Sequence, residues 1–169
     1  WVNLGNAYKL VGSLEEGLEA YSRALDLDPE NHALAVNKGM MLLKLGRDEG
    51  WPLYERRVHL VDFADKDLQK LNSPRWNGET VSGKKVVVYT EQGAGDTFQF
   101  CRYISWLKSL GATVVLYCGK TVRNVLETLE GVDELVVVGQ KIPKHDFRIS
   151  IMSLPEMYVR LGATFEFSA

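Results

Sequence analysis

The stretch over residues 86–100 most constrains the fold, because a β-branched run there meets a glycine-hinged turn and then an acidic residue. The valines at 86–88 favour a buried strand, and Gly93 and Gly95 permit a tight turn. Asp96 then opens a predicted helix. Open α/β folds bind ligands at such junctions, at the carboxyl edge of a parallel sheet. We therefore expect the functional site at this junction.

Composition excludes several functional classes. The 169 residues are 46% hydrophobic and 25% charged, which is ordinary for one large or two small globular domains. The formal net charge is -2 and the basic residues are scattered, so we expect no nucleic-acid partner. No apolar run approaches the roughly 18 to 20 residues that span a bilayer, and no signal region opens the chain. We expect a cytoplasmic protein without a membrane span.

Metal ligation is not expected either. Cys101 and Cys118 lack the CxxC spacing of a zinc or redox site, and buried free thiols are the simpler interpretation. His32, His59 and His145 fall on different predicted elements and form no metal or catalytic-triad pattern.

The hydrophobic pattern changes character near residues 62–83. Residues 1–61 have helical periodicity, whereas residues 84–169 alternate β-branched runs with amphipathic segments. Between them, residues 72–78 are rich in turn formers, and Trp76 is the large apolar residue among them. We expect a helical domain, a linker over residues 62–83 that Trp76 pins to a domain surface, and an α/β domain.

The helical part has a repeating pattern. Two sets of residues each fall on one face of a helix, and about 34 residues after Gly5 and Gly12 the same residue type recurs at Gly39 and Gly46. This pattern resembles the tetratricopeptide repeat, which implies about two repeats and a role in protein binding or domain positioning. The two sets are Trp1, Leu4, Gly5 and Tyr8, then Leu14, Gly17, Tyr21 and Ala24.

The second repeat departs from the pattern, since Trp51 stands where the small residue of its second helix is expected. Asp28 and Pro29 are predicted to be the N-cap and first residue of the helix that follows the first repeat. The charged residues 54–57 are interpreted as a solvated helix end, with docking against the second domain as the alternative. Because about three repeats are usual, we expect further repeats upstream of this sequence.

The α/β part predicts a parallel sheet. Its strands are expected over residues 85–90, 112–118, 134–138 and 147–152, with helices over residues 96–110 and 120–129. Right-handed crossovers with one reversal predict the strand order 3-2-1-4. The loops at residues 91–96 and 153–155 would then line one crevice, between the first and fourth strands.

Three chemistries could use this crevice. Dinucleotide binding is disfavoured, because Phe98 replaces the third glycine of the motif and no acidic residue ends the second strand. Gly119-Lys-Thr121 matches the end of a phosphate-binding loop, but Val114 replaces its first glycine. A group-transfer site with Asp96 as a weak base remains. The alternative is that Asp96 only caps its helix.

A longer series of short motifs extends over both parts of the chain. The motifs are Gly50-Trp51, Tyr54-Glu-Arg56, Trp76-Asn-Gly-Glu79, Gly83-Lys84, residues 91–96, Phe100-Cys-Arg-Tyr103, Gly131-Val-Asp133 and Ser153-Leu-Pro155. In this order they resemble tetratricopeptide-repeat proteins fused to a heptosyltransferase-like (family 9) glycosyltransferase domain. The resemblance implies a GT-B fold of two Rossmann-like domains, of which this sequence would hold only the N-terminal half. It also implies that Asp96 is the catalytic base of an inverting transfer without an obligatory metal.

We therefore predict a glycosyltransferase fragment that is inactive alone and whose parent uses a nucleotide-sugar donor, with no other cofactor. A protein or glycan acceptor is expected as partner, while the sugar, the acceptor and the oligomeric state stay open. The alternative is a non-catalytic protein-binding scaffold that acts through the repeats. The predicted site has Asp96 as the catalytic residue and, as substrate-binding residues, Glu91, Gln92, Gly93, Gly95, Thr97 and Ser153.

Overall fold

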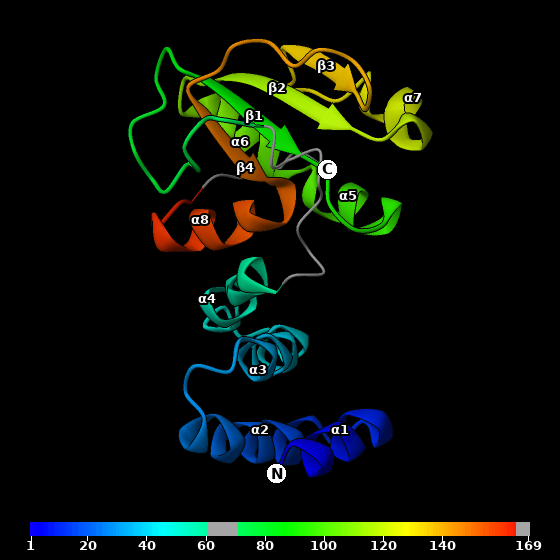
Figure 1. Ribbon diagram of the computed structural model, residues 1–169, viewed down its shortest axis with the longest axis vertical. Helices are drawn as coiled ribbons and strands as arrows, with labels where there is room; N and C mark the ends of the chain where they lie inside the picture. Colours follow the sequence, from blue (N-terminus) through cyan, green and yellow to red (C-terminus); the bar gives the residue numbers. More distant parts are fainter. Residues whose placement is uncertain (61–70, 165–169) are drawn as a thin grey trace. The chain divides into compact units, whose positions relative to one another are not determined.

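The computed structural model describes residues 1–60 and 71–164. The chain divides into two compact units, Trp1–Ala64 and Asp65–Ala169, which are treated separately below (Figure 1). The first is helical and the second is α/β, in the order that the sequence predicts. Residues 61–70, which are the last residue of the predicted repeat region and the first part of the predicted linker, lie outside the described residues. So do residues 165–169 of the predicted α/β domain.

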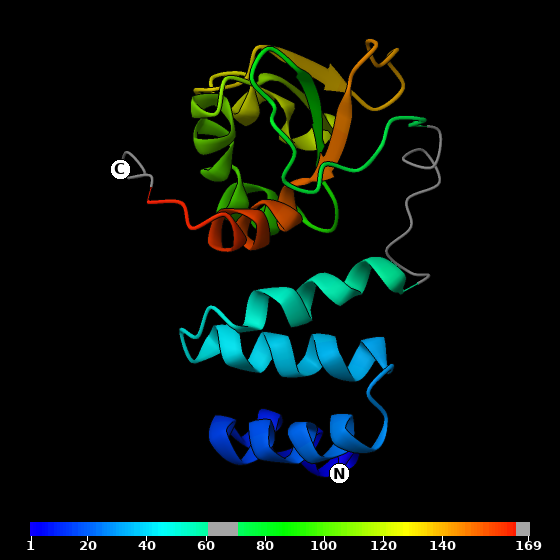
Figure 2. The same ribbon diagram turned by 90° about the vertical axis from the view of Figure 1, so that its left-hand side faces the viewer.

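The helical unit consists of successive helical hairpins (Figure 2). Helix α1 packs against α2, α2 against α3, and α3 against α4, which continues into the 3₁₀ helix η1. A buried cluster of Tyr21, Ala24, Leu34 and Met41 joins the hairpins. The elements are α1 (Val2–Val11), α2 (Leu14–Leu27), α3 (His32–Lys44), α4 (Gly50–Glu55) and η1 (Arg56–His59).

The N-cap of α3 is Asn31, so the prediction of Asp28 and Pro29 at this helix start is wrong. The Asn31 side chain accepts a hydrogen bond of 3.0 Å from the Leu34 N–H. Asp28 instead belongs to the preceding turn, where its N–H bonds to the Ala24 carbonyl at 3.2 Å. Its carboxylate accepts a 2.9 Å hydrogen bond from the Asn31 amide. Asp28 therefore supports the capping residue from outside the helix.

A glycine pair sets the distance between α3 and α4. A Cβ added to Gly39 would lie 2.6 Å from the Tyr54 nitrogen, and one added to Gly50 would lie 2.6 Å from the Gly39 carbonyl oxygen. The small residue of the second repeat is therefore Gly50, one position before the Trp51 that the repeat period selects. Trp51 is half-buried, and its ring and that of Tyr54 form an edge-to-face pair with centroids 6.3 Å apart.

The end of this unit is not the solvated helix end that the sequence predicts. Arg57 is fully buried, with its Nη1 2.6 Å from a carboxylate oxygen of Glu55. Its guanidinium carbon lies 4.9 Å from the centroid of the Tyr54 ring. The planar guanidinium can combine an ion pair with stacking on an aromatic ring, which allows its burial.

The α/β unit is built on a four-stranded parallel sheet of order β3-β2-β1-β4, as predicted (Figure 1). The valines of β1 are fully buried, as expected for a strand covered on both faces. In the pairing register, Val87 lies between Val115 of β2 and Arg148 of β4. The strands are β1 (Lys85–Tyr89), β2 (Thr113–Cys118), β3 (Glu134–Val137) and β4 (Phe147–Ser150).

The helices of this unit are shorter than predicted. The expected helix over residues 96–110 is broken at Cys101 and Arg102, where the Arg102 Nε donates to the Gln99 carbonyl at 2.9 Å. The helical segments are α5 (Ala94–Phe100), α6 (Tyr103–Ser109), η4 (Lys120–Val122), α7 (Arg123–Leu126), η5 (Ile151–Ser153) and α8 (Leu154–Arg160).

Residues that were assigned to the linker pack within this unit. Trp76 is buried, lies 6.0 Å from the Trp106 ring of α6, and donates from its indole to the Glu79 carbonyl at 2.8 Å. Its backbone N–H donates to the carbonyl of Arg148 in β4 at 2.9 Å. Trp76 therefore pins its segment to the domain, as the sequence predicts.

Asp133 fixes the start of β3. Its carboxylate accepts 2.7 Å hydrogen bonds from the Val114 N–H and the Lys108 ammonium. Burial tends to raise the pKa of Asp133, but the Lys108 and Val114 bonds outweigh it, so the net pKa lies below its ordinary value. The carboxylate thus links α6, β2 and β3.

None of the helices within residues 1–60 and 71–164 combines the length and the apolar character that crossing a bilayer requires.

Gly39→Ala should destabilise the helical unit by about 1–3 kcal/mol, because the new methyl group meets backbone atoms that cannot move aside. Thermal and urea denaturation followed by circular dichroism measure this. Gly95→Ala is the control, since its helical position has open space around it. Equal stability of Gly39→Ala and wild type would contradict the close approach of α3 and α4.

Asp133→Asn should cost about 0.5–1 kcal/mol at neutral pH, since the amide keeps an acceptor for Val114 but loses the charge facing Lys108. A lowered carboxylate pKa stabilises the fold above the ordinary value of 3.8, and this stabilisation is lost as the pH falls through the folded-state pKa. The difference between variant and wild type should therefore shrink in acid. Urea unfolding at several pH values tests this, and a difference that grows in acid would contradict it.

Candidate functional site

The order in which strands are added to the sheet reverses between β1 and β4, and the carboxyl ends of these two parallel strands lie side by side. Ser150, the last residue of β4, donates a hydrogen bond from its hydroxyl to the Glu91 carboxylate beyond β1. The same Ser150 oxygen accepts a 3.1 Å bond from the Met152 N–H, and Ser150 is only 2% exposed. Helix α5 also contacts η5, so the two predicted loops do come together.

Sequence reasoning missed Ser150. The residue lies inside the predicted strand over residues 147–152, so nothing in the pattern separated it from a core position. The structure ends β4 at Ser150 because the hydroxyl turns the chain by accepting the Met152 N–H. A serine at the carboxyl end of a strand next to the reversal is the signal that could have identified it.

The loop after β1 has one unusual backbone conformation. Gln92 has a φ of 60°, in the left-handed region that non-glycine residues seldom adopt. Gly93 then N-caps α5, and its N–H donates to the Asp96 carboxylate at 3.2 Å. The N-cap of α5 is thus Gly93 and not Asp96, which is the third residue of the helix. The Asp96 carboxylate still contributes to the helix start by accepting the N–H of the N-cap residue. Among the described residues, the Gly93 N–H is the donor to the Asp96 carboxylate.

The predicted site residues differ in exposure. Gln92, Gly93 and Gly95 are exposed, whereas Glu91 and Asp96 are half-buried. Two further members are buried: Thr97 is 2% exposed and donates to the Gly93 carbonyl at 3.2 Å, and Ser153 is fully buried. The exposed and half-buried residues can contact a ligand directly, whereas Thr97 and Ser153 support the backbone of the two loops. Their substrate-binding role stays a prediction.

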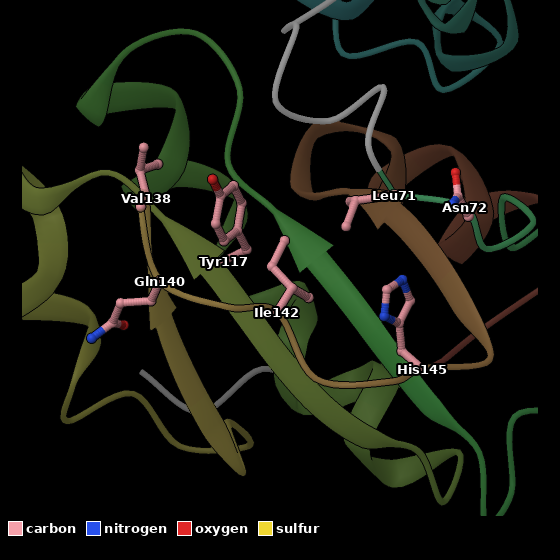
Figure 3. A pocket seen from close by; sticks show the side chains of 8 residues that line it. Leu71, Asn72, Tyr117, Val138, Gln140, Ile142 and His145 are labelled. Atoms are coloured by element: carbon pink, nitrogen blue, oxygen red, sulfur yellow. The ribbon is translucent and has the colours of Figure 1, made fainter.

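Two pockets lie at the carboxyl ends of β2 and β3. The first encloses about 450 Å³ on the sheet face that carries Tyr117, and Figure 3 shows the side chains around it. The second encloses about 540 Å³ and is lined by residues of η4, α7 and the end of β3. Both are lined by Val138, Gly139 and Gln140, so this short segment separates two adjoining cavities.

Metal ligation finds no support in the described ranges, where no three His, Cys, Asp or Glu side chains gather as a metal site. Cys101 and Cys118 are free thiols, and burial raises the pKa of both. His32 and His59 are not as scattered as the sequence suggests, because their rings stack at 4.4 Å. Arg56 donates to the His32 Nδ1 at 3.1 Å, which orients this pair.

Comparison with known proteins supports the helical part. The tetratricopeptide repeat family model matches residues 1–31. Protein FlbA of Caulobacter vibrioides is 31% identical over 98 residues, which are 56% of this chain but only 16% of FlbA. No solved structure shows significant similarity. These matches do not point to a heptosyltransferase, so that resemblance stays an expectation.

Ser150→Ala should destabilise the α/β unit by about 1–3 kcal/mol, because it leaves the buried Met152 N–H and the Glu91 carboxylate without this hydroxyl. Differential scanning calorimetry measures the effect. Ser109→Ala is the matched control, since Ser109 is exposed and bonds only to a carbonyl of its own helix. Similar small effects for both variants would show that the Glu91–Ser150 contact does not hold the strand ends together.

Proposed function

We propose that this chain is the acceptor-side part of a glycosyltransferase, with Asp96 as the base. The observation that carries the proposal is the position of half-buried Glu91 and Asp96 at the reversal between β1 and β4. Open parallel sheets bind ligands at this point. The heptosyltransferase resemblance of the surrounding motifs assigns the same role to Asp96.

In the proposed reaction, Asp96 accepts the proton of an acceptor hydroxyl while that oxygen attacks the anomeric carbon of a nucleotide sugar. The bond from the anomeric carbon to the departing nucleoside diphosphate breaks, and the configuration inverts. The Asp96 Oδ2 accepts the Gly93 N–H at 3.2 Å, which leaves Oδ1 to accept the proton. Glu91 is restrained by Ser150 and supplies a second carboxylate for orienting hydroxyl groups. The Gly93–Asp96 bond holds the base in place.

The half that binds the donor would lie outside this sequence. The matched part of this chain covers only 16% of the length of FlbA. We therefore propose that transfer requires the longer polypeptide and that this chain alone is inactive. The acceptor would be a protein or a glycan.

A protein-binding role of the repeats has its own support, because the tetratricopeptide model matches residues 1–31. Stacked helical hairpins of this class form extended binding surfaces. One surface hollow in the helical unit, of about 190 Å³, combines the Trp1 and Tyr8 rings with Glu16, Glu19 and Arg23. This mixture of aromatic and charged groups suits a peptide segment. The repeats would then recruit the acceptor or, in a scaffold without catalysis, act alone.

Asp96→Asn in the natural polypeptide that carries this sequence should lower sugar transfer by about 10²–10⁴-fold, the usual contribution of a general base. Asparagine can still accept the Gly93 N–H, so the thermal midpoint should change little. Release of nucleoside diphosphate from a panel of nucleotide sugars measures turnover.

Glu130→Gln serves as the matched control, because it removes an exposed carboxylate of the same unit. Full turnover in Asp96→Asn would leave that residue as a helix cap only. Absence of transfer from every nucleotide sugar in the wild-type polypeptide would reject the enzymatic proposal and leave the protein-binding one.

A further inference from the structure

The two adjoining pockets at the ends of β2 and β3 share no lining residue with the Asp96 loop and differ from each other in chemistry. The first has an uncharged lining: apolar side chains, the Tyr117 ring, two amides and a histidine. In Figure 3 the Tyr117 ring lies between Val138 and Ile142, while Gln140 points away from them. A neutral ring with polar edges fits such a lining. Its residues are Leu71, Asn72, Tyr117, Val138, Gly139, Gln140, Ile142 and His145.

His145 gives this pocket a directional polar group. Its Nδ1 lies 2.8 Å from the Pro143 carbonyl, which requires the proton on Nδ1 when the ring is neutral. Its Nε2 is then a buried acceptor, for which the described residues provide no donor. A donor group on a bound ring would satisfy it, as buried acceptors require.

The second pocket has a cationic lining. Lys120, Arg123 and Asn124 line it, and none of the described residues around it is acidic. Arg123 lies 3.4 Å from the exposed carboxylate of Glu127, an ion pair of low strength that an anion can displace. A phosphate group suits this combination of ammonium, guanidinium and amide donors.

The segment shared by both pockets is held in place by backbone hydrogen bonds. The Val138 N–H donates to the Cys118 carbonyl at 2.9 Å, and the Gln140 N–H donates to the Val137 carbonyl at 2.9 Å. The Gln140 side chain accepts from the Val137 N–H at the same distance. A preformed rim reduces the ordering cost of binding. One ligand that crosses this rim would meet both linings.

We propose that the adjoining pockets form one site for an organic phosphate, in which an uncharged ring lies beside Tyr117 and the phosphate contacts Lys120 and Arg123. This site goes beyond the proposed transfer at Asp96 and contains none of its residues. Its chemistry fits a nucleoside phosphate or a sugar phosphate. It also gives a role to Lys120 of Gly119-Lys-Thr121, a segment that does not complete a phosphate-binding loop.

The test is an NMR titration of the ¹⁵N-labelled chain with uridine diphosphate, adenosine diphosphate, glucose 1-phosphate and inorganic phosphate. We expect shifts in the amides of Tyr117, residues 138–140 and residues 120–124, with an organic phosphate binding more tightly than inorganic phosphate. The preferred organic probe distinguishes nucleoside from sugar phosphates. The double variant Lys120→Gln/Arg123→Gln should weaken binding about tenfold or more, because it removes both charge-assisted contacts.

Val138→Trp should also weaken the binding of the organic phosphates. The larger side chain, at an exposed position, would fill the pocket beside Tyr117 and leave Lys120 and Arg123 unchanged. Lys44→Gln/Arg102→Gln is the control, since these exposed cations line neither pocket. Absence of shifts in these segments, or binding of inorganic phosphate as tight as that of every organic probe, would overturn the proposal. Because Asp96→Asn should leave this titration unchanged, failure here is distinguishable from failure of the proposed transfer.

Discussion

The pairing of β1 with two parallel neighbours is the constraint on which the α/β unit depends. Every residue from Val86 to Tyr89 has a partner in both β2 and β4. The central valines are fully buried, so β1 can neither slip in register nor leave the sheet without exposing apolar surface and breaking backbone hydrogen bonds. The place of β1 also decides which loops meet, because parallel strands end at the same edge.

Two regions of different chemistry follow from this arrangement. On the β4 side of β1, the contact between Ser150 and Glu91 brings carboxylates to the reversal of the sheet. On the β2 side, the ends of β2 and β3 border a neutral pocket and a cationic one. The first suits proton transfer and the second suits phosphate binding. One sheet edge can thus hold two ligand groups without sharing residues.

The sequence predicts the strands and their order well, because valine-rich runs such as that of β1 and β2 have few alternative arrangements. It fails at local interruptions: a turn at Cys101 and Arg102 divides the predicted helix, and Ser150 ends β4 early. The repeat period places the small residue at Trp51, although the close approach to Gly39 is made by Gly50. Neither the burial of Arg57 nor the stacking of His32 on His59 is visible in the sequence, since both depend on tertiary contacts. For the candidate site, the sequence located the loop after β1 but not its partner Ser150.

Amide hydrogen exchange followed by NMR tests the central place of β1 most directly. A strand paired on both sides should have a continuous run of slowly exchanging amides over residues 86–89, which open only in global unfolding. The edge strand β3 should show slow exchange only at the amides that face β2. Rapid or alternating exchange along β1 would contradict its central position, and with it the meeting of Glu91 and Ser150.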